Sequence, residues 1–332
     1  MKEKIPATPE NVRAGTSAAK SGVTRRGLLR QTAATALSWA AFARLNSAIP
    51  GALPNPVGYS NISWPQEQLD QALETVSALG YQGVQLLGWV QEVYAGERTA
   101  ELKDRLQKLK LSAAALSCSK VKLRPDSPEN FKAEFRDYAD FLQSLGGNVL
   151  QLIDGGKPRG NYSAGEIKSL GAKMNEMGKM AKDSGMIVGY HPHFGTLGET
   201  REGLGSVLDA TDPRYVGLIA DVAHLKFGGS DPAEVIRTYH QRLVLLHLKD
   251  VRRDTYGLAR QNRDAAEKLK FRFCEISHGV VGFSAVTAGL RESQFRGWVI
   301  VELDRFEPPA GGPAESARIN KEALRSLGFQ IG

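Results

Sequence analysis

The sequence predicts an α/β fold, a single-domain (β/α)8 TIM barrel, on two observations. From about residue 56 onward, short apolar runs alternate with amphipathic stretches of helical spacing, which is the pattern of repeated βα units and a parallel sheet. There are eight such apolar runs, and eight parallel strands close a barrel. No Pro- or Ser-rich linker divides this region, so we expect one barrel over residues 56–330.

The expected elements follow one another in order along the chain. Strands are expected at residues 57–63, 83–87, 112–118, 148–153, 187–190, 216–220, 243–247 and 298–303. Helices are expected at residues 66–79, 99–109, 128–145, 164–184, 232–239 and 284–293, where apolar residues recur on one face. Gly80, Gly146 and Gly185 follow three of these helices and are typical C-terminal stops.

Residues 252–276 are the irregular part of the barrel region. They are polar and basic and contain no clear strand, which predicts an extended loop after the seventh strand. Such a loop is either a solvated insertion or a lid over a site at the strand ends.

Residues 1–48 have the layout of a bacterial twin-arginine signal peptide with an N-terminal extension. The string TRRGLLR at residues 24–30 precedes an Ala-rich apolar stretch, and no acidic residue lies between Glu10 and Glu67. The alternative is an ordinary amphipathic helix with a basic start. We expect the twin-arginine export machinery to carry the folded protein to the periplasm or the outside.

The net charge argues against a nucleic-acid partner. Residues 1–50 contain eight Lys and Arg and two Glu, so they supply six of the seven net positive charges of the chain. The remaining domain is close to neutral and lacks the basic excess that phosphate binding requires. We therefore expect a small-molecule ligand. A homo-oligomer is possible.

Polar side chains end four successive expected strands. Because the C-terminal ends of barrel strands meet at one face, these side chains should converge there. A lone histidine in a strand is more often a hydrogen-bonded core residue, and Asp221 alone could cap the next turn. Together, however, buried carboxylates and imidazoles favour a bound divalent ion such as Mn²⁺, Mg²⁺, Co²⁺ or Zn²⁺. The candidates are His191, His193, Asp221, His224, His247, Lys249 and Glu302, with Asp250 and Asp304 as supporting or loop residues.

Four strings carry a resemblance to a known family: GYHPHFGT (189–196), DVAHL (221–225), HLKD (247–250) and GWVIVELD (297–304). They resemble the sugar phosphate isomerase/epimerase family, the xylose-isomerase-like TIM barrels, over roughly residues 57–328. The resemblance implies a metal-dependent barrel acting on sugars, keto sugars or inositol derivatives. It also implies that His191, Asp221, His247 and Glu302 are the metal ligands, with Lys249 and His224 beside them.

The fifth strand departs from the pattern of many epimerases in this family. His191 stands where they have a glutamate, so the chain retains only Glu302 of their two opposed carboxylates. The His-x-His-Phe-Gly-Thr form resembles the inosose dehydratase branch and lyases of keto sugars. If the strand stays extended past Pro192, His193 reaches the same face as His191, and either histidine could be the ligand.

The function we expect first is a metal-dependent isomerase or epimerase. It would act on a non-phosphorylated sugar or keto sugar through an enediolate, because exported enzymes rarely meet phosphorylated sugars. Glu302, His191 or His193 would serve as base, and Lys249 or His224 as proton donor. The first alternative is a dehydratase or lyase that uses β-elimination on a keto sugar or inosose. The others are a non-catalytic sugar-binding accessory protein and a phosphodiesterase, which the near-neutral charge disfavours.

Overall fold

A computed structural model of the chain describes residues 51–124, 126, 131–155 and 162–332. The expected signal peptide lies outside these residues. Within them, no helix is both long and apolar enough to cross a membrane.

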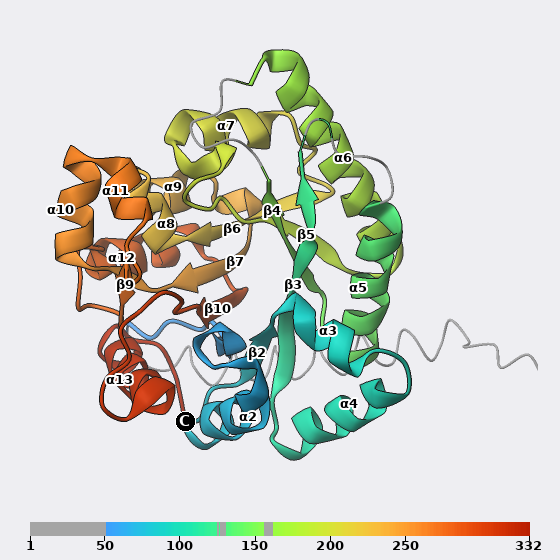
Figure 1. Cartoon of the computed structure of the whole chain (residues 1–332), viewed down its shortest axis with the longest axis vertical. Helices are drawn as coiled ribbons and strands as arrows, with labels where there is room; N and C mark the ends of the chain where they lie inside the picture. The colour runs from blue at the N-terminus through green and yellow to red at the C-terminus, as the bar shows by residue number, and fades with distance from the viewer. Residues whose placement is uncertain (1–50, 125, 127–130, 156–161) are drawn as a thin grey trace, which may run out of the picture. The chain divides into compact units, whose positions relative to one another are not determined.

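Eight parallel strands close into one barrel with helices around it (Figure 1), which confirms the predicted fold class. The barrel order is β1-β10-β7-β6-β5-β4-β3-β2, so the last barrel strand along the chain pairs with the first. Each of the eight strands falls where the sequence predicts one. Their bounds are β1 (Val57–Ser60), β2 (Gly83–Leu86), β3 (Ser112–Leu123), β4 (Val149–Asp154), β5 (Ile187–Tyr190), β6 (Val216–Asp221), β7 (Leu243–Leu248) and β10 (Trp298–Val301).

Six expected helices are present, and the described residues contain further helices that were not predicted. The expected helices are α2 (Leu69–Ala78), α4 (Thr99–Lys108), α5 (Phe131–Leu145), α6 (Ala164–Asp183), α9 (Pro232–Thr238) and α12 (Phe283–Ser293). The others outside 252–276 are α3 (Gly88–Tyr94), α7 (Arg201–Asp209), α8 (Val222–Phe227) and α13 (Gly312–Ser326). The helices α3 and α8 are too short for a periodic apolar pattern to distinguish them from the strands they follow. Single 3-10 turns lie at Asn61–Ser63, Gln66–Gln68, Gly96–Arg98, Leu197–Glu199 and His240–Arg242.

The extended loop predicted for residues 252–276 is wrong. The segment contains α10 (Arg253–Gln261) and α11 (Arg263–Glu267), and β9 (Phe273–Cys274) pairs antiparallel with β8 (Asp250–Val251). Thr255 is the buried residue of α10, and the rest of that helix is more exposed. The helix is amphipathic but polar on average, so it lacks the apolar content by which the buried helices were predicted.

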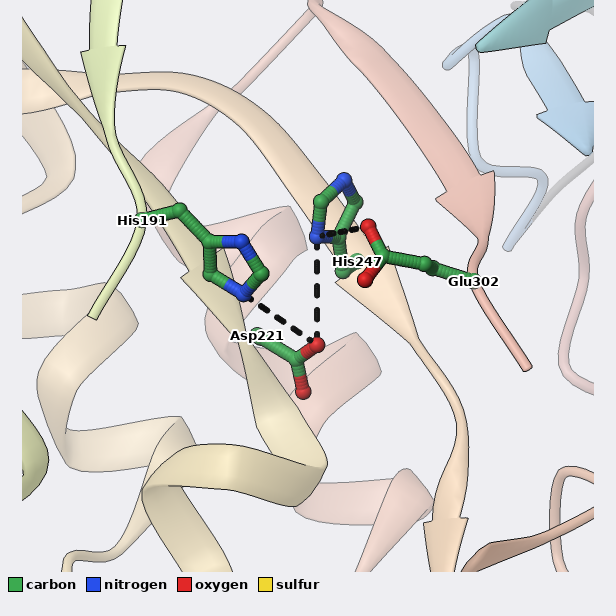
Figure 2. A group of neighbouring side chains, drawn as sticks. All are labelled: His191, Asp221, His247 and Glu302. Atoms are coloured by element: carbon green, nitrogen blue, oxygen red, sulfur yellow. Dashed lines mark ion pairs between the residues drawn. The ribbon is translucent and has the colours of Figure 1, made fainter. Parts of the chain in front are cut away.

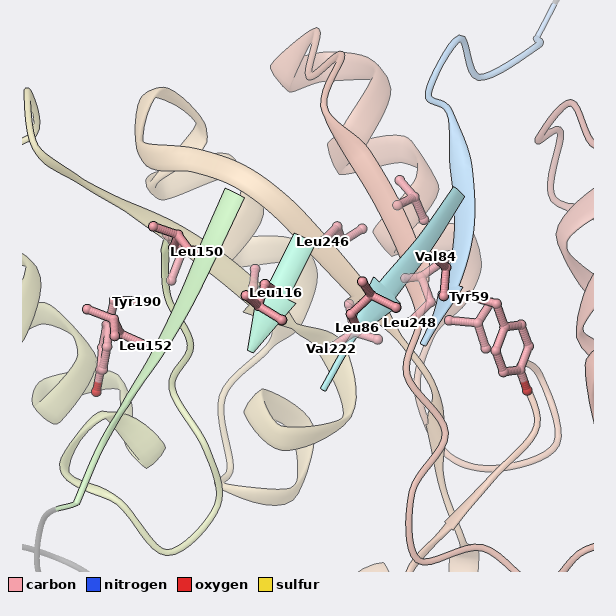
Figure 3. Packing of buried hydrophobic residues seen from close by; sticks show 14 of the residues in the cluster. Tyr59, Val84, Leu86, Leu116, Leu150, Leu152, Tyr190, Val222, Leu246 and Leu248 are labelled. Carbon is pink, nitrogen blue, oxygen red and sulfur yellow. The ribbon is translucent and has the colours of Figure 1, made fainter. Parts of the chain in front are cut away.

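Two hydrophobic clusters position the site. The larger one joins the strands to the surrounding helices, and Figure 3 shows part of it, including Leu86, Leu116 and Leu150. The smaller one contains Val149, Ile219, Leu245, Trp298 and Ile300. Side chains two residues apart on a strand point to the same face. The residues two positions further along these strands therefore stack on the smaller cluster at the C-terminal end of the barrel.

Candidate metal centre

Four buried side chains converge above the smaller hydrophobic cluster (Figure 2). Asp221 ends β6, His247 lies in β7, and His191 and Glu302 directly follow β5 and β10. One possible ligand atom from each residue lies within 4.8 Å of the others. Pairing of adjacent strands fixes this arrangement, because Asp221 is opposite His247 in the register of β6 with β7. The structure thus brings together all four residues that the sequence predicts as ligands.

The donor atoms of this cluster fit a divalent cation. His191 Nε2 lies 3.6 Å from Asp221 Oδ2, and His247 Nδ1 lies 2.9 Å from Glu302 Oε2. Within the described part of the chain, His191 Nε2, Asp221 Oδ2 and His247 Nδ1 are buried without a hydrogen bond of good geometry. Buried polar atoms left in this state cost free energy, which a cation bound among them would offset. Two carboxylates and imidazole nitrogens are ligands that Zn²⁺, Mn²⁺ or Co²⁺ accept.

Two buried glutamines connect the histidines, and the sequence analysis did not find them. Gln85 Oε1 lies 2.7 Å from His247 Nε2, and Gln151 Nε2 lies 2.8 Å from His191 Nδ1. Gln85 Nε2 donates to Gln151 Oε1 at 2.8 Å and to Glu302 Oε2 at 3.1 Å. The sequence feature that could have pointed to them is a single glutamine inside each of two apolar strands, β2 and β4.

Lys249 is a fully buried cation beside the cluster. Its Nζ lies 3.1 Å from Asp221 Oδ2, 3.6 Å from Glu302 Oε1 and 2.8 Å from Asp304 Oδ1. Burial by itself would lower the pKa of Lys249, but these three carboxylates raise it above its ordinary value. The lysine is therefore protonated at neutral pH. Asp304, which the sequence placed in a supporting role, supplies the shortest of its ion pairs.

The carboxylates of the cluster are ionised. Burial would raise the pKa of Asp221 and of Glu302, but Lys249 and neighbouring histidines lower both below their ordinary values. Burial lowers the pKa of His247, so Lys249 is the charged partner of both carboxylates, at 3.1 Å from Asp221 Oδ2 and 3.6 Å from Glu302 Oε1. The site therefore offers negative charge to a cation or to an electrophile.

His193 and His224 form a neutral pair next to the cluster. Their ring centroids lie 3.8 Å apart, while the rings of His193 and His191 lie 5.7 Å apart. Burial, then the neighbouring His191, lowers the pKa of His193 to about 4. Burial and His193 lower the pKa of His224 well below its ordinary value. Of the two histidines after β5, His191 belongs to the four-residue cluster and His193 lies beside it.

Asp250 and the two remaining histidines of the chain lie elsewhere. The carboxylate of Asp250 accepts the backbone N–H groups of Val251, Gly279 and Val281, so it holds the loop before α12. His240 and His278 are exposed, and neither belongs to the cluster.

Comparison with known proteins agrees with this architecture. Residues 73–327 match the family model described as xylose isomerase-like TIM barrel, and the chain belongs to this family. Among curated relatives, the inosose dehydratase of Clostridium tetani is 27% identical over 282 residues, which cover 79% of this chain and 92% of the relative. The inosose dehydratase of Bacillus cereus (strain AH820) is also 27% identical, with the same shares covered.

Solved structures share the fold at lower identity. The probable 3-DHS dehydratase AsbF from Bacillus anthracis superposes with a TM-score of 0.65 at 15% identity, covering 82% of this chain and 98% of that one. The IolI protein, solved with a binding zinc atom, gives a TM-score of 0.67 at 18% identity and the same coverage. The chain is therefore an enzyme of the xylose isomerase-like family, and its buried cluster could hold a divalent metal ion.

Proposed function

We propose that this enzyme is a divalent-metal-dependent dehydratase that removes water from a keto sugar or an inosose by β-elimination. The curated inosose dehydratases, which align along most of the chain, support this elimination over the isomerisation or epimerisation that the sequence analysis put first. The observation that carries the proposal is the pair of side chains beside the cluster: Lys249, whose Nζ lies 3.1 Å from Asp221 Oδ2, and His193, whose ring lies 5.7 Å from that of His191.

Elimination needs one base and one acid, and these two side chains provide them. A divalent ion in the cluster would polarise a substrate carbonyl and make the adjacent C–H acidic. His193 Nδ1 lies 2.7 Å from the Phe194 carbonyl oxygen, to which it donates, so the lone pair is on Nε2. From there the ring can take the proton of the carbon next to the carbonyl.

Departure of the hydroxyl group completes the reaction. The electron pair of the broken C–H bond forms the new C=C bond, and the C–O bond at the β carbon breaks. Lys249 gives a proton to the leaving hydroxide, which departs as water, and His193 holds the proton taken from carbon. His224 Nε2 lies 3.2 Å from Lys249 Nζ and can help to return a proton to the lysine. Glu302 is an alternative base, although its contacts with His247 and Gln85 favour a binding role.

The product distinguishes elimination from the other reactions of the family. The metal-loaded enzyme is mixed with inosose and with non-phosphorylated keto sugars in D₂O, and products are followed by NMR and mass spectrometry. We expect a product that has lost one water and carries a new alkene signal. A product of unchanged mass with deuterium next to the carbonyl would show an isomerase or epimerase instead. Sugar binding without any conversion would contradict both.

We also propose that residues 1–48 direct export through the twin-arginine pathway, so that the substrate is an extracytoplasmic, non-phosphorylated compound. The supporting feature is the paired arginine before the apolar stretch.

A further inference from the structure

We propose that Asp154 is a positioning residue for His193, the side chain that takes the substrate proton in the proposed mechanism. Asp154 does not belong to the metal cluster. It holds the loop after β5 (residues 191–200) at two points, one on each side of His193, and thereby sets the place of the imidazole. The inference rests on the proposed function, in which His193 is the base.

The loop leaves the barrel sheet directly after its first residue. The His191 N–H still donates to the Leu152 carbonyl oxygen at 2.8 Å, which continues the ladder between β4 and β5. The backbone of His193, by contrast, is bonded within the loop. Its carbonyl oxygen accepts from Thr196 Oγ1 at 2.8 Å, and its N–H donates to the same hydroxyl at 3.3 Å. These bonds shape the loop, so its attachments to the barrel decide where the imidazole lies.

Asp154 provides two such attachments. It ends β4 and is buried. Its Oδ2 accepts from the hydroxyl of Tyr190, the last residue of β5, at 2.7 Å, and its Oδ1 accepts from the Leu197 N–H at 3.0 Å. Leu152 is opposite Tyr190 in the strand register, and Asp154 lies two residues further on the same face (Figure 3). One carboxylate therefore joins the two sides of the loop that carries His193.

Gly198 shows how closely the loop approaches this contact. A Cβ atom at this position would lie 2.0 Å from Tyr190 Oη and 3.0 Å from Pro192 Cβ. A side chain here would push the loop away from the tyrosine or displace the tyrosine itself. Glycine therefore allows the backbone of residues 197–198 to lie against the hydroxyl that Asp154 holds.

The metal cluster has separate support. His191 is held by its ladder bond to Leu152 and by Gln151, whose Nε2 lies 2.8 Å from His191 Nδ1. Removing the carboxylate of Asp154 should therefore displace His193 and leave the cluster in place. A misplacement of about 1 Å at a reacting group can cost about 10²-fold in rate. The expected signature is a lower kcat at unchanged metal content.

Kinetics of the zinc-loaded, full-length protein with inosose test this signature. We expect D154A, which removes both acceptors, to retain zinc and to lower kcat about 10²-fold with a much smaller change in KM. D154N is the conservative control, because its amide can still accept from Leu197 and donate to the Tyr190 hydroxyl oxygen, so it should recover most of kcat. G198A leaves the carboxylate intact but displaces the loop, so it should lower kcat as D154A does. It provides the same comparison if D154A does not fold.

A double-mutant cycle shows whether Asp154 acts through His193. H193N alone should lower kcat by about 10²–10⁴-fold. In that background D154A should change kcat by less than about twofold, because the group that it positions is already absent. A further loss of about 10²-fold in the double variant would make the two effects independent and would overturn the inference. Unchanged kcat in both D154A and G198A would overturn it as well.

Imidazole ¹H–¹⁵N NMR of the metal-free, full-length protein provides a measurement that needs no turnover. We expect the ring signals of His193 to shift or broaden in D154A and G198A, while those of His191 stay where they are. Unchanged His193 signals in both variants would contradict the positioning role. If the wild type converted no inosose, or if H193N kept its kcat, the proposed function would fail. The NMR spectra would still decide whether Asp154 places His193.

Discussion

Asp221 divides its two carboxylate oxygens between the fold and the site. Oδ1 accepts the backbone N–H groups of Ala223 and His224 and caps α8, while Oδ2 faces the metal cluster. The sequence offered capping and metal binding as alternatives for this residue, but the geometry allows both. Because the two tasks use different atoms, substitutions can separate them.

Comparing D221N with D221A should separate the capping of α8 from metal binding. Both variants remove the charge, so we expect both to lose bound metal in elemental analysis. Asparagine retains a carbonyl oxygen that can cap α8, and alanine does not. The metal-free D221A protein should therefore unfold about 1 kcal/mol more easily than D221N in a denaturant titration. Full metal content in D221N would refute the ligand assignment.

Lys249 should be needed for turnover and not for metal binding. K249M keeps much of the side-chain volume next to Phe273, whose ring centroid lies 4.7 Å from Nζ, but it removes the acid. We expect zinc content to be retained and kcat to fall by about 10²–10⁴-fold. The matched control is D304N, which leaves the lysine in place and should reduce kcat less. Normal turnover in K249M would exclude its role as acid.

The neutral histidines should make the metal-free protein sensitive to mild acid. The folded-state pKa of His193 is about 4, below its ordinary value of 6.5. Between these pH values the unfolded state binds a proton that the folded state does not, so stability falls as the pH falls through this window. In EDTA, the unfolding free energy of H193N should decline less steeply than that of the wild type from pH 6.5 to 4. Identical pH profiles would contradict the low pKa.

At the scale of elements, α11 is fastened to the loop after β5. Arg263 of α11 forms a buried ion pair with Glu199, and its guanidinium lies 4.2 Å from the centroid of the Phe194 ring. Glu199 also accepts the Gly195 N–H at 2.8 Å. The segment predicted as a loop or lid thus contains a helix that is attached to the loop carrying His193.

Removing Arg263 should loosen the attachment of α11. In R263M, Glu199 stays buried without its partner, which typically costs about 3–5 kcal/mol. We expect faster hydrogen exchange in residues 193–199 and 250–276, together with a higher KM. The double variant E199M/R263M, which removes both charges, should recover most of the stability. Unchanged exchange in R263M would mean that the ion pair does not hold α11 in place.

At the scale of the whole molecule, export can be tested separately from the barrel. Residues 1–50 are fused to a reporter that is active only outside the cytoplasm, and Arg25 and Arg26 are replaced by lysine in a second fusion. We expect export of the first fusion, loss with the double replacement, and loss in a host without the twin-arginine machinery. Export that persists in that host would show that residues 1–50 do not use the twin-arginine pathway.

Local pattern explains why so much of the barrel could be predicted. A strand buried on both faces leaves a short apolar run, and the polar residue that ends it marks the C-terminal face. This placed Asp221, His247 and the other two cluster residues among the candidates, and the family resemblance singled them out as the expected ligands. The helices of residues 252–276 bury little apolar surface and contain no apolar run, so they could not be predicted in this way. A glutamine within a strand such as β2 does not indicate which distant side chain it will contact.

The sequence by itself determined the eight strands, their order along the chain and the four polar side chains at the strand ends, because each depends on residues close together in the chain. The tertiary structure decided which of these side chains meet. Gln85 contacts His247, 162 residues away, because closure of the barrel brings β2 and β7 to one interior. Hydrogen bonds across that interior depend on strand pairing and shear, which no local pattern encodes.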